Sequence, residues 1–254
     1  LLAGMQKGRL GDCWRRPAGE QVALAMDLLS LVGYQGSVHT PAEALPHVDR
    51  RLVEIARALA LAPGVLLLDE PAAGLSRADT DRVTELLRTI AGYGIAVILV
   101  EHDMTMVMSV SDRILVLDSG RPIAWGEPED IRANPDVVRA YLGSTDYQAP
   151  PRPEPWDGSR DATLFVKDLV IDYGAAPVVE GVSLMVNPGE LIAILGANGA
   201  GKSSILQAIA GLHGASAGSV VLNNESIETL DASDIAGKGL ALVPEGRQVF
   251  PELS

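Results

Sequence analysis

One glycine-rich stretch of the chain contains the residue types that hold a phosphate group. It matches the pattern G-x-x-x-x-G-K-[ST], and it lies between an expected strand at 190–195 and an expected helix at 202–212. Glycines let successive backbone N–H groups turn toward phosphate oxygens, and a helix N-terminus adds partial positive charge. Lys202 supplies a mobile charge for the β- and γ-phosphates, and the Ser203 hydroxyl can ligate Mg²⁺. The stretch, called the phosphate loop below, comprises Gly196, Asn198, Gly199, Ala200, Gly201, Lys202, Ser203 and Ser204.

Two further polar clusters directly follow apolar runs that are typical of buried strands. The run at 65–68 ends in Asp69 and Glu70. Asp69 would hold Mg²⁺ through water and Glu70 would polarise an attacking water, because each task requires a negative charge or a proton acceptor. The run at 97–100 leads to His102, which can bond a γ-phosphate. Solvated strand-end acids and a structural histidine are the competing interpretations.

Hydrophobic periodicity predicts an α/β chain that alternates strands and helices. Helices are expected at 20–34, 49–62, 78–91, 128–142 and 202–212, and strands at 65–68, 95–100, 113–117, 121–125, 163–172, 177–186, 190–195, 217–223 and 239–243. Asp118-Ser119-Gly120 predicts a hairpin turn. In the second of these helices, the apolar face is expected to be buried and the charged residues to lie largely outside it. The charged residues are Arg50, Arg51, Glu54 and Arg57.

Composition limits the partners and the chemistry. The 254 residues carry a net charge of −13, so the overall electrostatic field of the chain does not attract the phosphate backbone of nucleic acids. Only 4% of the residues are aromatic, which argues against recognition of single-stranded nucleic acid by stacking. Cys13 is the single cysteine, which excludes an internal disulfide and a cysteine-based zinc site. No apolar run approaches the length of a membrane span, and residues 1–14 do not form a signal peptide.

These motifs together resemble the ATP-binding subunits of ABC transporters. VLLLDEPAAGL is similar to the Walker B and D-loop segment, LVEHDM to the H-loop, and LGANGAGKSS to the Walker A motif. Tyr173 resembles the A-loop aromatic that stacks on adenine, and ALVPEGRQVFPEL resembles the Q-loop region, with Glu245 in place of the usual Gln. The resemblance implies a P-loop fold of the ABC ATPase type. Its mainly parallel sheet would be joined by an antiparallel part early in the second half.

Both halves are similar to the paired ATPase subunits of branched-chain amino acid importers. RLVEIARALA and GRPIAWGEPEDIRANPDVVRAYLG resemble the end of one subunit, and VPEGRQVF resembles the start of the other. The resemblance implies ATP and Mg²⁺ as cofactors and ATP hydrolysis coupled to transport. It also implies transmembrane permease subunits, a second ABC ATPase domain, an indirect solute-binding protein and a peripheral place on the cytoplasmic face of the membrane. Nucleic acid is not an expected partner.

The order of the motifs does not fit one ordinary domain, because Walker A normally precedes Walker B. Residues 1–145 resemble the C-terminal part of a first ATPase domain, 146–160 form a linker with four prolines, and 161–254 resemble the N-terminal part of a second domain. In one interpretation the chain is an internal piece of a tandem fusion. In the other, the two halves dock as one circularly permuted domain, which would bring Lys202 near Asp69, Glu70 and His102.

The stretch Leu45-Pro46-His47-Val48-Asp49 stands where the family has its signature loop. Pro46 replaces a serine and lacks both a hydroxyl and an N–H, and Val48 replaces a glycine where phosphate must approach. Asp49 adds negative charge. We expect one degenerate composite site that binds ATP and hydrolyses it poorly. Alternatively, Pro46 merely starts a helix.

Two rival functions remain at this point. The first is a non-transport ABC ATPase acting on ribosomes or nucleic acid, which a short, non-basic linker and an acidic chain disfavour. The second is a non-catalytic binding or regulatory piece, which an ATPase assay would separate from the importer component.

Overall fold

The structure is a computed structural model that describes residues 18–139, 163–174 and 176–245. The helices are α2 (Ala18–Leu31), η2 (Ala42–Ala44), α3 (His47–Leu59), α4 (Arg77–Gly92), α5 (Met104–Val110), α6 (Pro128–Ala133), α7 (Pro135–Val137), α8 (Lys202–Ile209) and α9 (Ala232–Gly237). The strands are β1 (Val65–Asp69), β2 (Ala96–Glu101), β3 (Arg113–Asp118), β4 (Arg121–Gly126), β5 (Leu164–Asp172), β6 (Pro177–Val186), β7 (Leu191–Gly196), β8 (Ala217–Leu222), β9 (Glu225–Ser226) and β10 (Leu240–Val243). The expected linker at 146–160 lies outside the described residues.

The central six-stranded sheet is built from both halves of the chain. Its strand order is β10-β1-β2-β7-β3-β4, so β7 lies between β2 and β3 and β10 flanks β1. All neighbours pair in parallel except β3 and β4. The strand that leads into the phosphate loop is therefore hydrogen-bonded on both sides to strands from before the expected linker.

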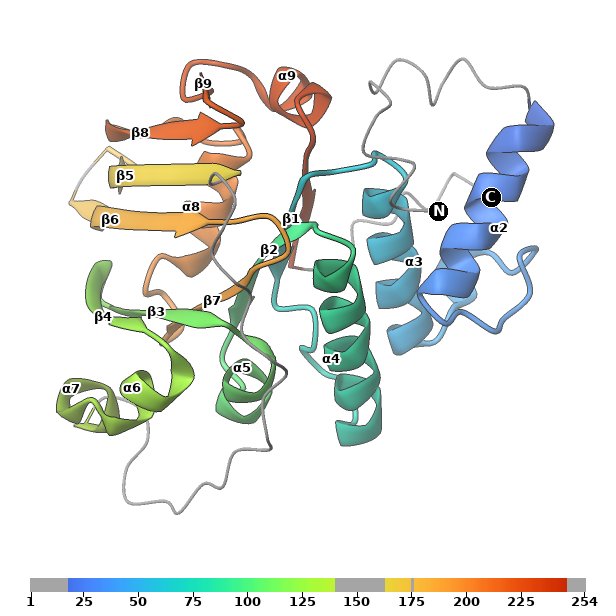
Figure 1. Cartoon of the computed structure of the whole chain (residues 1–254), viewed down its shortest axis with the longest axis horizontal. Helices are drawn as coiled ribbons and strands as arrows, with labels where there is room; N and C mark the ends of the chain where they lie inside the picture. Colours follow the sequence, from blue (N-terminus) through green and yellow to red (C-terminus); the bar gives the residue numbers. More distant parts are fainter. Residues whose placement is uncertain (1–17, 140–162, 175, 246–254) are drawn as a thin grey trace.

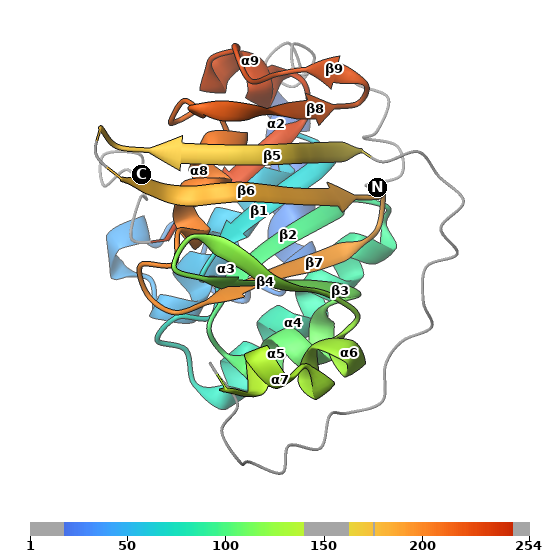
Figure 2. The same cartoon turned by 90° about the vertical axis from the view of Figure 1, so that its left-hand side faces the viewer.

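A second sheet, of four strands, has the order β6-β5-β8-β9 and is antiparallel throughout. Figure 1 shows it on one side of the central sheet, with α2, α3 and α4 on the other, and Figure 2 looks onto the antiparallel side. The predicted fold class, a mainly parallel P-loop sheet with an antiparallel part early in the second half, is confirmed.

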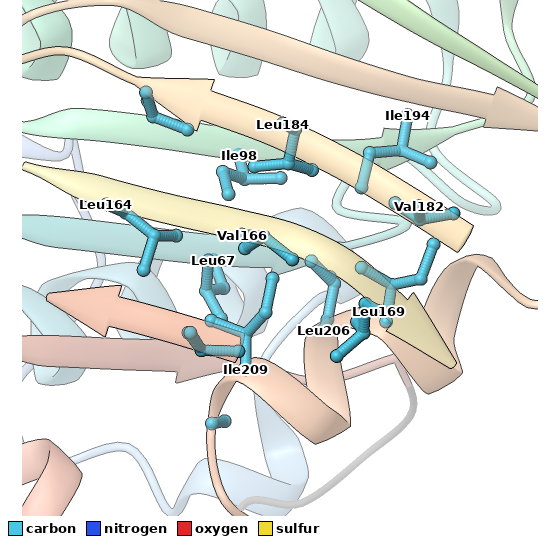
Figure 3. Packing of buried hydrophobic residues seen from close by; sticks show 14 of the residues in the cluster. Leu67, Ile98, Leu164, Val166, Leu169, Val182, Leu184, Ile194, Leu206 and Ile209 are labelled. Carbon is cyan, nitrogen blue, oxygen red and sulfur yellow. The ribbon is translucent and has the colours of Figure 1, made fainter. Parts of the chain in front are cut away.

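The parallel strands read as continuous apolar runs because both of their faces are covered. Leu67, Ile98 and Ile194 point toward the antiparallel sheet and α8, where they pack with Val166 and Leu206 (Figure 3). The alternate residues of the same strands face the helical side. These include Leu66, Leu68, Val97 and Leu99, which pack in one cluster with residues of α2, α3 and α4.

Most expected elements occur within a few residues of their predicted bounds, and the hairpin turn after β3 is confirmed. Ser119 and Gly120 have positive φ angles of 49° and 83°, as a tight two-residue hairpin requires. The single helix expected at 128–142 is wrong. Asn134 interrupts it, accepting hydrogen bonds from Asp136 N and Val137 N, so that two short helices form instead of one.

The periodicity predicted that the charged residues of α3 lie largely outside its buried face, and for two of them this prediction is wrong. Both residues are buried: the exposed fraction is 6% for Arg51 and 8% for Glu54. They form an ion pair at 2.9 Å between Nη1 and Oε2. A buried charge is tolerated where it finds a partner, and here each residue supplies one for the other.

The described residues include no helix long and apolar enough to cross a membrane.

Candidate nucleotide-binding site

The three polar clusters meet at one edge of the central sheet. β1 ends at Asp69, β2 at Glu101 and β7 at Gly196, and these three strands are parallel neighbours. The carboxyl ends of parallel strands lie at the same edge, which is where ligands bind in open α/β sheets. The motifs therefore come together although their order along the chain is inverted.

The phosphate loop turns sharply from β7 into α8 through glycines with left-handed backbone. Gly199 and Gly201 have φ angles of 83° and 90°. A Cβ at Gly201 would lie 2.7 Å from Val179 Cγ2 and 2.9 Å from the Val178 carbonyl oxygen. The close approach of β6 thus requires glycine at position 201, whereas a Cβ at Gly199 would meet nothing within 4 Å.

Lys202 lies inside the loop and is held by backbone carbonyls. Its Nζ donates hydrogen bonds to the oxygens of Gly196 at 3.0 Å and Ala197 at 3.2 Å. Only 5% of the residue is exposed. The described residues include no carboxylate in an ion pair with Lys202, although the charges of Asp69 and Lys202 act on each other from a greater distance. This arrangement fits a phosphate group at this position.

Ser203 and Asp69 approach each other as a cation site would need. Ser203 Oγ donates a hydrogen bond to Asp69 Oδ1 at 3.0 Å. Burial raises the pKa of the Asp69 carboxyl, and the charges of Glu245 and Glu70 act in the same direction, against the Ser203 hydrogen bond and the Lys202 charge. A hydroxyl and a carboxylate are oxygen ligands of the kind Mg²⁺ prefers, so these residues fit the expected ion.

Glu70 and His102 face each other beside this pair. His102 Nδ1 lies 3.4 Å from Glu70 Oε2, and the Glu70 side chain is 14% exposed. Glu70 has a positive φ of 44°, a strained conformation for a residue other than glycine. Such strain is found where the surroundings fix a functional residue in place, and Glu70 stands at the strand end where a water-activating carboxylate is expected.

Glu101 is a site residue that the sequence analysis assigned no role. Its Oε1 accepts a hydrogen bond from Ala72 N at 2.8 Å, and its Oε2 accepts one from His102 N at 3.1 Å. Burial raises the pKa of this carboxyl, and both hydrogen bonds oppose the rise. Glu101 therefore ties the segment after Glu70 to the backbone of His102. An acid directly after the apolar run at 97–100 was the signal that could have indicated it.

Tyr173 lies next to the start of α8, with half of the residue exposed. Its hydroxyl donates to Ser204 Oγ at 3.2 Å. Its ring stacks on His213, with centroids 4.3 Å apart and planes inclined by 26°. His213 is a second residue that sequence reasoning missed, and no motif marks it. The stacked histidine and the serine bond fix the orientation of the tyrosine ring.

The remaining expected residues lie around the same edge. Glu245, exposed, follows β10 by two positions, and its charge acts on Asp69. Asn198 is exposed in the loop, and Ala200 is buried with its N–H donating to the Ala197 carbonyl oxygen at 3.0 Å. All the predicted site residues are thus found within one region.

α3 begins within the stretch at 45–49, two residues earlier than the predicted start at residue 49. The helix starts at His47, and Pro46 is its N-cap residue without a side-chain hydrogen bond. Val48 packs against the apolar cluster under α2, α3 and α4. The N-terminus of α3 therefore has neither a hydroxyl at its cap nor a glycine in its first turn.

Two segments of the chain match known families. Residues 179–254 match the family described as ABC transporter, and residues 121–147 match the family described as branched-chain amino acid ATP-binding cassette transporter. The fold and these matches define the class: the structure has the fold of an ABC-type ATPase.

The curated relatives that this chain matches are described as ATP-binding proteins of transport or import systems. The high-affinity branched-chain amino acid transport ATP-binding protein LivG of Salmonella typhimurium is 43% identical over 145 residues, which is 56% of this chain and 57% of that protein. BraF of Pseudomonas aeruginosa, with the same description, is 41% identical over 144 residues, or 56% of this chain and 55% of that protein. The ribose import ATP-binding protein RbsA 1 of Streptomyces avermitilis is 29% identical over 98% of this chain and 45% of its own length. The chain thus spans about half the length of the curated relatives it matches.

Proposed function

We propose that this chain is an ATP-binding and ATP-hydrolysing component of an ABC importer for branched-chain amino acids or related solutes. The observation that carries the proposal is the 3.0 Å hydrogen bond between Ser203 Oγ and Asp69 Oδ1. It joins the Walker A and Walker B residues of the two halves in one site. Similarity to LivG and BraF supports the class of solute, and the same similarity favours an importer over a non-transport ATPase.

Each residue of the site has a task in phosphoryl transfer to water. The phosphate loop and Lys202 bind the phosphates of ATP, and Tyr173 stacks on the adenine. Ser203 and Asp69 would hold Mg²⁺, which neutralises phosphate charge when it is bound. Glu70 accepts the proton of the attacking water, and His102 orients the γ-phosphate. Positioning and charge account for most of the catalysis.

The test is ATP binding by the purified 254-residue chain and by its Lys202→Ala variant. We expect Lys202→Ala to weaken binding by about 10-fold to 100-fold, because a hydrogen bond to a charged group contributes about 1.5–3 kcal/mol. Lys167→Ala is the matched control, since this lysine is exposed on the antiparallel sheet. Equal affinity in the two variants would contradict the proposal. ATP binding without turnover would instead favour a non-catalytic role.

We also propose that the two halves come from neighbouring domains of a tandem protein, the C-terminal part of one followed by the N-terminal part of the next. The alignment with RbsA 1 supports this, because it runs through 98% of this chain and occupies only 45% of the relative. A protein more than twice as long thus carries similar segments in the same order. Transmembrane permeases, a second ATPase domain and a peripheral place on the cytoplasmic face are the partners and location we propose with it.

The flanking coding sequence tests the tandem arrangement. We expect a Walker A motif upstream of Leu1 and a signature motif with a second Walker B downstream of Ser254. Flanks that lack these motifs would leave a circularly permuted single domain as the arrangement, with β7 between β2 and β3 as its central pairing.

We propose further that the signature stretch at 45–49 makes one composite site degenerate. Pro46 offers no hydroxyl and no N–H to a phosphate, and Val48 is turned into the core under α3. Asp49 in the first turn repels a triphosphate. In a tandem protein this stretch would face the Walker A motif of Lys202, so that site would bind ATP and turn it over slowly.

The test is the double substitution Pro46→Ser with Val48→Gly in the full-length protein, followed by measurement of turnover. We expect the turnover rate to rise, because the cap gains a hydroxyl and an N–H and the first turn gains a close approach to phosphate. Unchanged turnover in a folded double variant would remove the degenerate-site proposal.

A further inference from the structure

Arg51 of α3 connects the helix to two strand ends of the candidate site. Its Nη2 donates a hydrogen bond to the Glu70 carbonyl oxygen at 3.3 Å. Its Nη1 donates to the Pro244 carbonyl oxygen at 3.2 Å and to Glu54 Oε2 at 2.9 Å. One planar side chain therefore contacts α3, the residue after β1 and the residue after β10, which are separated by up to 193 positions in the chain.

The guanidinium is held in one place by its surroundings. It is buried, and Glu54, on the same helix, is buried beside it. Burial raises the pKa of the Glu54 carboxyl, and the neighbouring charges of Arg51, Arg57 and Arg50 oppose the rise. Removing either member of a buried pair leaves an uncompensated charge, so the pair is kept together. The planar fork of an arginine suits this task, because its N–H groups reach several acceptors at fixed angles.

The bond to Glu70 supports a strained part of the backbone. Glu70 adopts a φ of 44°. Its N–H donates to the Val100 carbonyl oxygen at 2.9 Å, and its own carbonyl oxygen accepts from Ala73 N at 3.2 Å as well as from Arg51. A left-handed conformation costs a residue other than glycine about 1–3 kcal/mol and persists only where neighbouring contacts over-determine it. The direction of the Glu70 carboxylate depends on this conformation.

The hydrogen bond from Arg51 to the Pro244 carbonyl oxygen holds the segment that follows β10. Pro244 directly precedes Glu245, the residue whose charge acts on Asp69. The hydrogen bond from Arg51 fixes the position of the Pro244 carbonyl and so the path of the chain after β10. It therefore also fixes the position of the Glu245 backbone. The two carbonyls that Arg51 holds thus belong to Glu70 itself and to the residue before Glu245.

We propose that Arg51 is a positioning residue that fixes the backbones of Glu70 and Pro244 relative to α3, so that the two carboxylates reach the nucleotide in one arrangement. The inference rests on the proposed function, because it gives Glu70 and Glu245 their places beside bound ATP. Since Arg51 touches neither the phosphate loop nor Tyr173, its loss affects turnover and spares nucleotide affinity.

The experiment compares Glu54→Gln with the double variant Arg51→Met/Glu54→Gln. The single variant keeps both carbonyl contacts, and the double variant removes them without leaving a buried unpaired carboxylate. We expect kcat to fall about 10-fold in the double variant relative to the single one, because small displacements of reacting groups have large effects on rate. KM for ATP should stay within about twofold, since the groups that bind phosphate are untouched.

Arg113→Met is the control for a general loss of stability. Arg113 also bonds a buried glutamate, Glu190, and a backbone carbonyl, that of Met185. It lies at the start of β3, the end of the strand opposite to the one beside the phosphate loop. We expect its melting temperature to fall and its kcat to remain unchanged.

Amide hydrogen exchange provides a readout that does not need turnover. We expect faster exchange at 70–75 and at 240–245 in the double variant than in Glu54→Gln, and no such change in Arg113→Met. If the unaltered chain fails to bind or hydrolyse ATP, the proposed function is wrong, and exchange alone then decides the role of Arg51. Exchange that rises only within α3, or nowhere, overturns the inference.

Three kinetic outcomes would also overturn it: a kcat within twofold of the Glu54→Gln value, a rise in KM at constant kcat, or an equal loss of kcat in Arg113→Met. Should the double variant fail to fold, Arg51→Lys takes its place under the same readouts. Lysine keeps the charge but lacks the planar fork, so it should fold and still lose at least about threefold in kcat. A lysine variant with full kcat contradicts the proposal.

Discussion

α8 and α3 both contact the carboxyl ends of the parallel strands, but they present different groups there. α8 begins after Gly201, in a loop whose backbone turns around the buried Lys202. α3 begins after Pro46 and reaches the same edge through the side chain of Arg51, in its second turn. α8 contributes its N-terminus and the buried Lys202, whereas α3 contributes the buried side chain of Arg51 and not its N-terminus.

A helix N-terminus alone therefore does not make a phosphate site. Every α-helix has the positive end of its dipole at its N-terminus, and the first N–H groups of both helices have no partner within the helix. Only α8 has glycines that let the preceding loop curl and leave room for an anion. At α3, Val48 packs into the core instead, and the helix serves to fix other segments of the site.

Substitutions in the turn before α8 should have the greatest effect on stability. Gly201→Ala places a Cβ 2.7 Å from Val179 Cγ2 and 2.9 Å from the Val178 carbonyl oxygen, at a φ of 90°. Gly199→Ala has nearly the same φ, 83°, with nothing within 4 Å. We expect Gly201→Ala to cost about 2–4 kcal/mol of stability, from backbone strain and overpacking together, and Gly199→Ala about 1 kcal/mol. Thermal unfolding of both variants measures this, and equal losses would show that the approach of β6 is unimportant.

A smaller effect is expected where Tyr173 rests on its neighbours near α8. His213→Ala removes the stacked ring and leaves the bond from Tyr173 to Ser204 in place. Because an aromatic pair contributes about 0.5–1.5 kcal/mol, we expect ATP affinity to fall about twofold to tenfold. Titration with ATP and with inorganic triphosphate gives the test. The loss should appear only for the ligand with a base, and an equal loss for both ligands would place His213 in phosphate binding.

The smallest effect concerns pH and belongs to α3. The pKa of Glu54 is raised by burial above its ordinary 4.5, so the folded protein binds this proton more tightly than the unfolded chain. Stability therefore falls as pH rises from about 4.5 through the raised value, and it recovers on acidification. Glu54→Gln lacks this dependence. Melting temperatures of both proteins over a series of pH values measure the difference, and parallel curves would mean that the Glu54 carboxyl is not buried as described.

Local patterns were sufficient to predict the phosphate loop and every described strand except the two-residue β9. Buried parallel strands such as 65–69 and 191–196 are continuous apolar runs, and the loop has a fixed spacing of glycine, lysine and serine. α5 was missed because it has only seven residues and depends on its cap, Asp103, which accepts hydrogen bonds from Thr105 N and Met106 N. Its apolar residues follow the polar cluster after β2 without a period long enough to detect.

Charged residues in helices were the least predictable part. Periodicity placed Arg51 and Glu54 toward solvent, because it assigns charge to the exposed face by default. Their burial depends on carbonyl acceptors at Glu70 and Pro244, which are 19 and 193 residues away from Arg51. The stacking of His213 on Tyr173 is another contact between segments distant in the chain, and no short motif predicts it.

Residue types and their spacing are enough to identify the groups that can act on a phosphate: a lysine and a serine after glycines, and acids after apolar runs. These are properties of residue type and short spacing, which a chain carries wherever its segments lie. Tertiary structure decided which segments meet. The pairing of β7 between β2 and β3 brings Ser203 to within 3.0 Å of Asp69 across 134 positions. Strand order decides this, because parallel strands expose their carboxyl ends at one edge whatever their order in the chain.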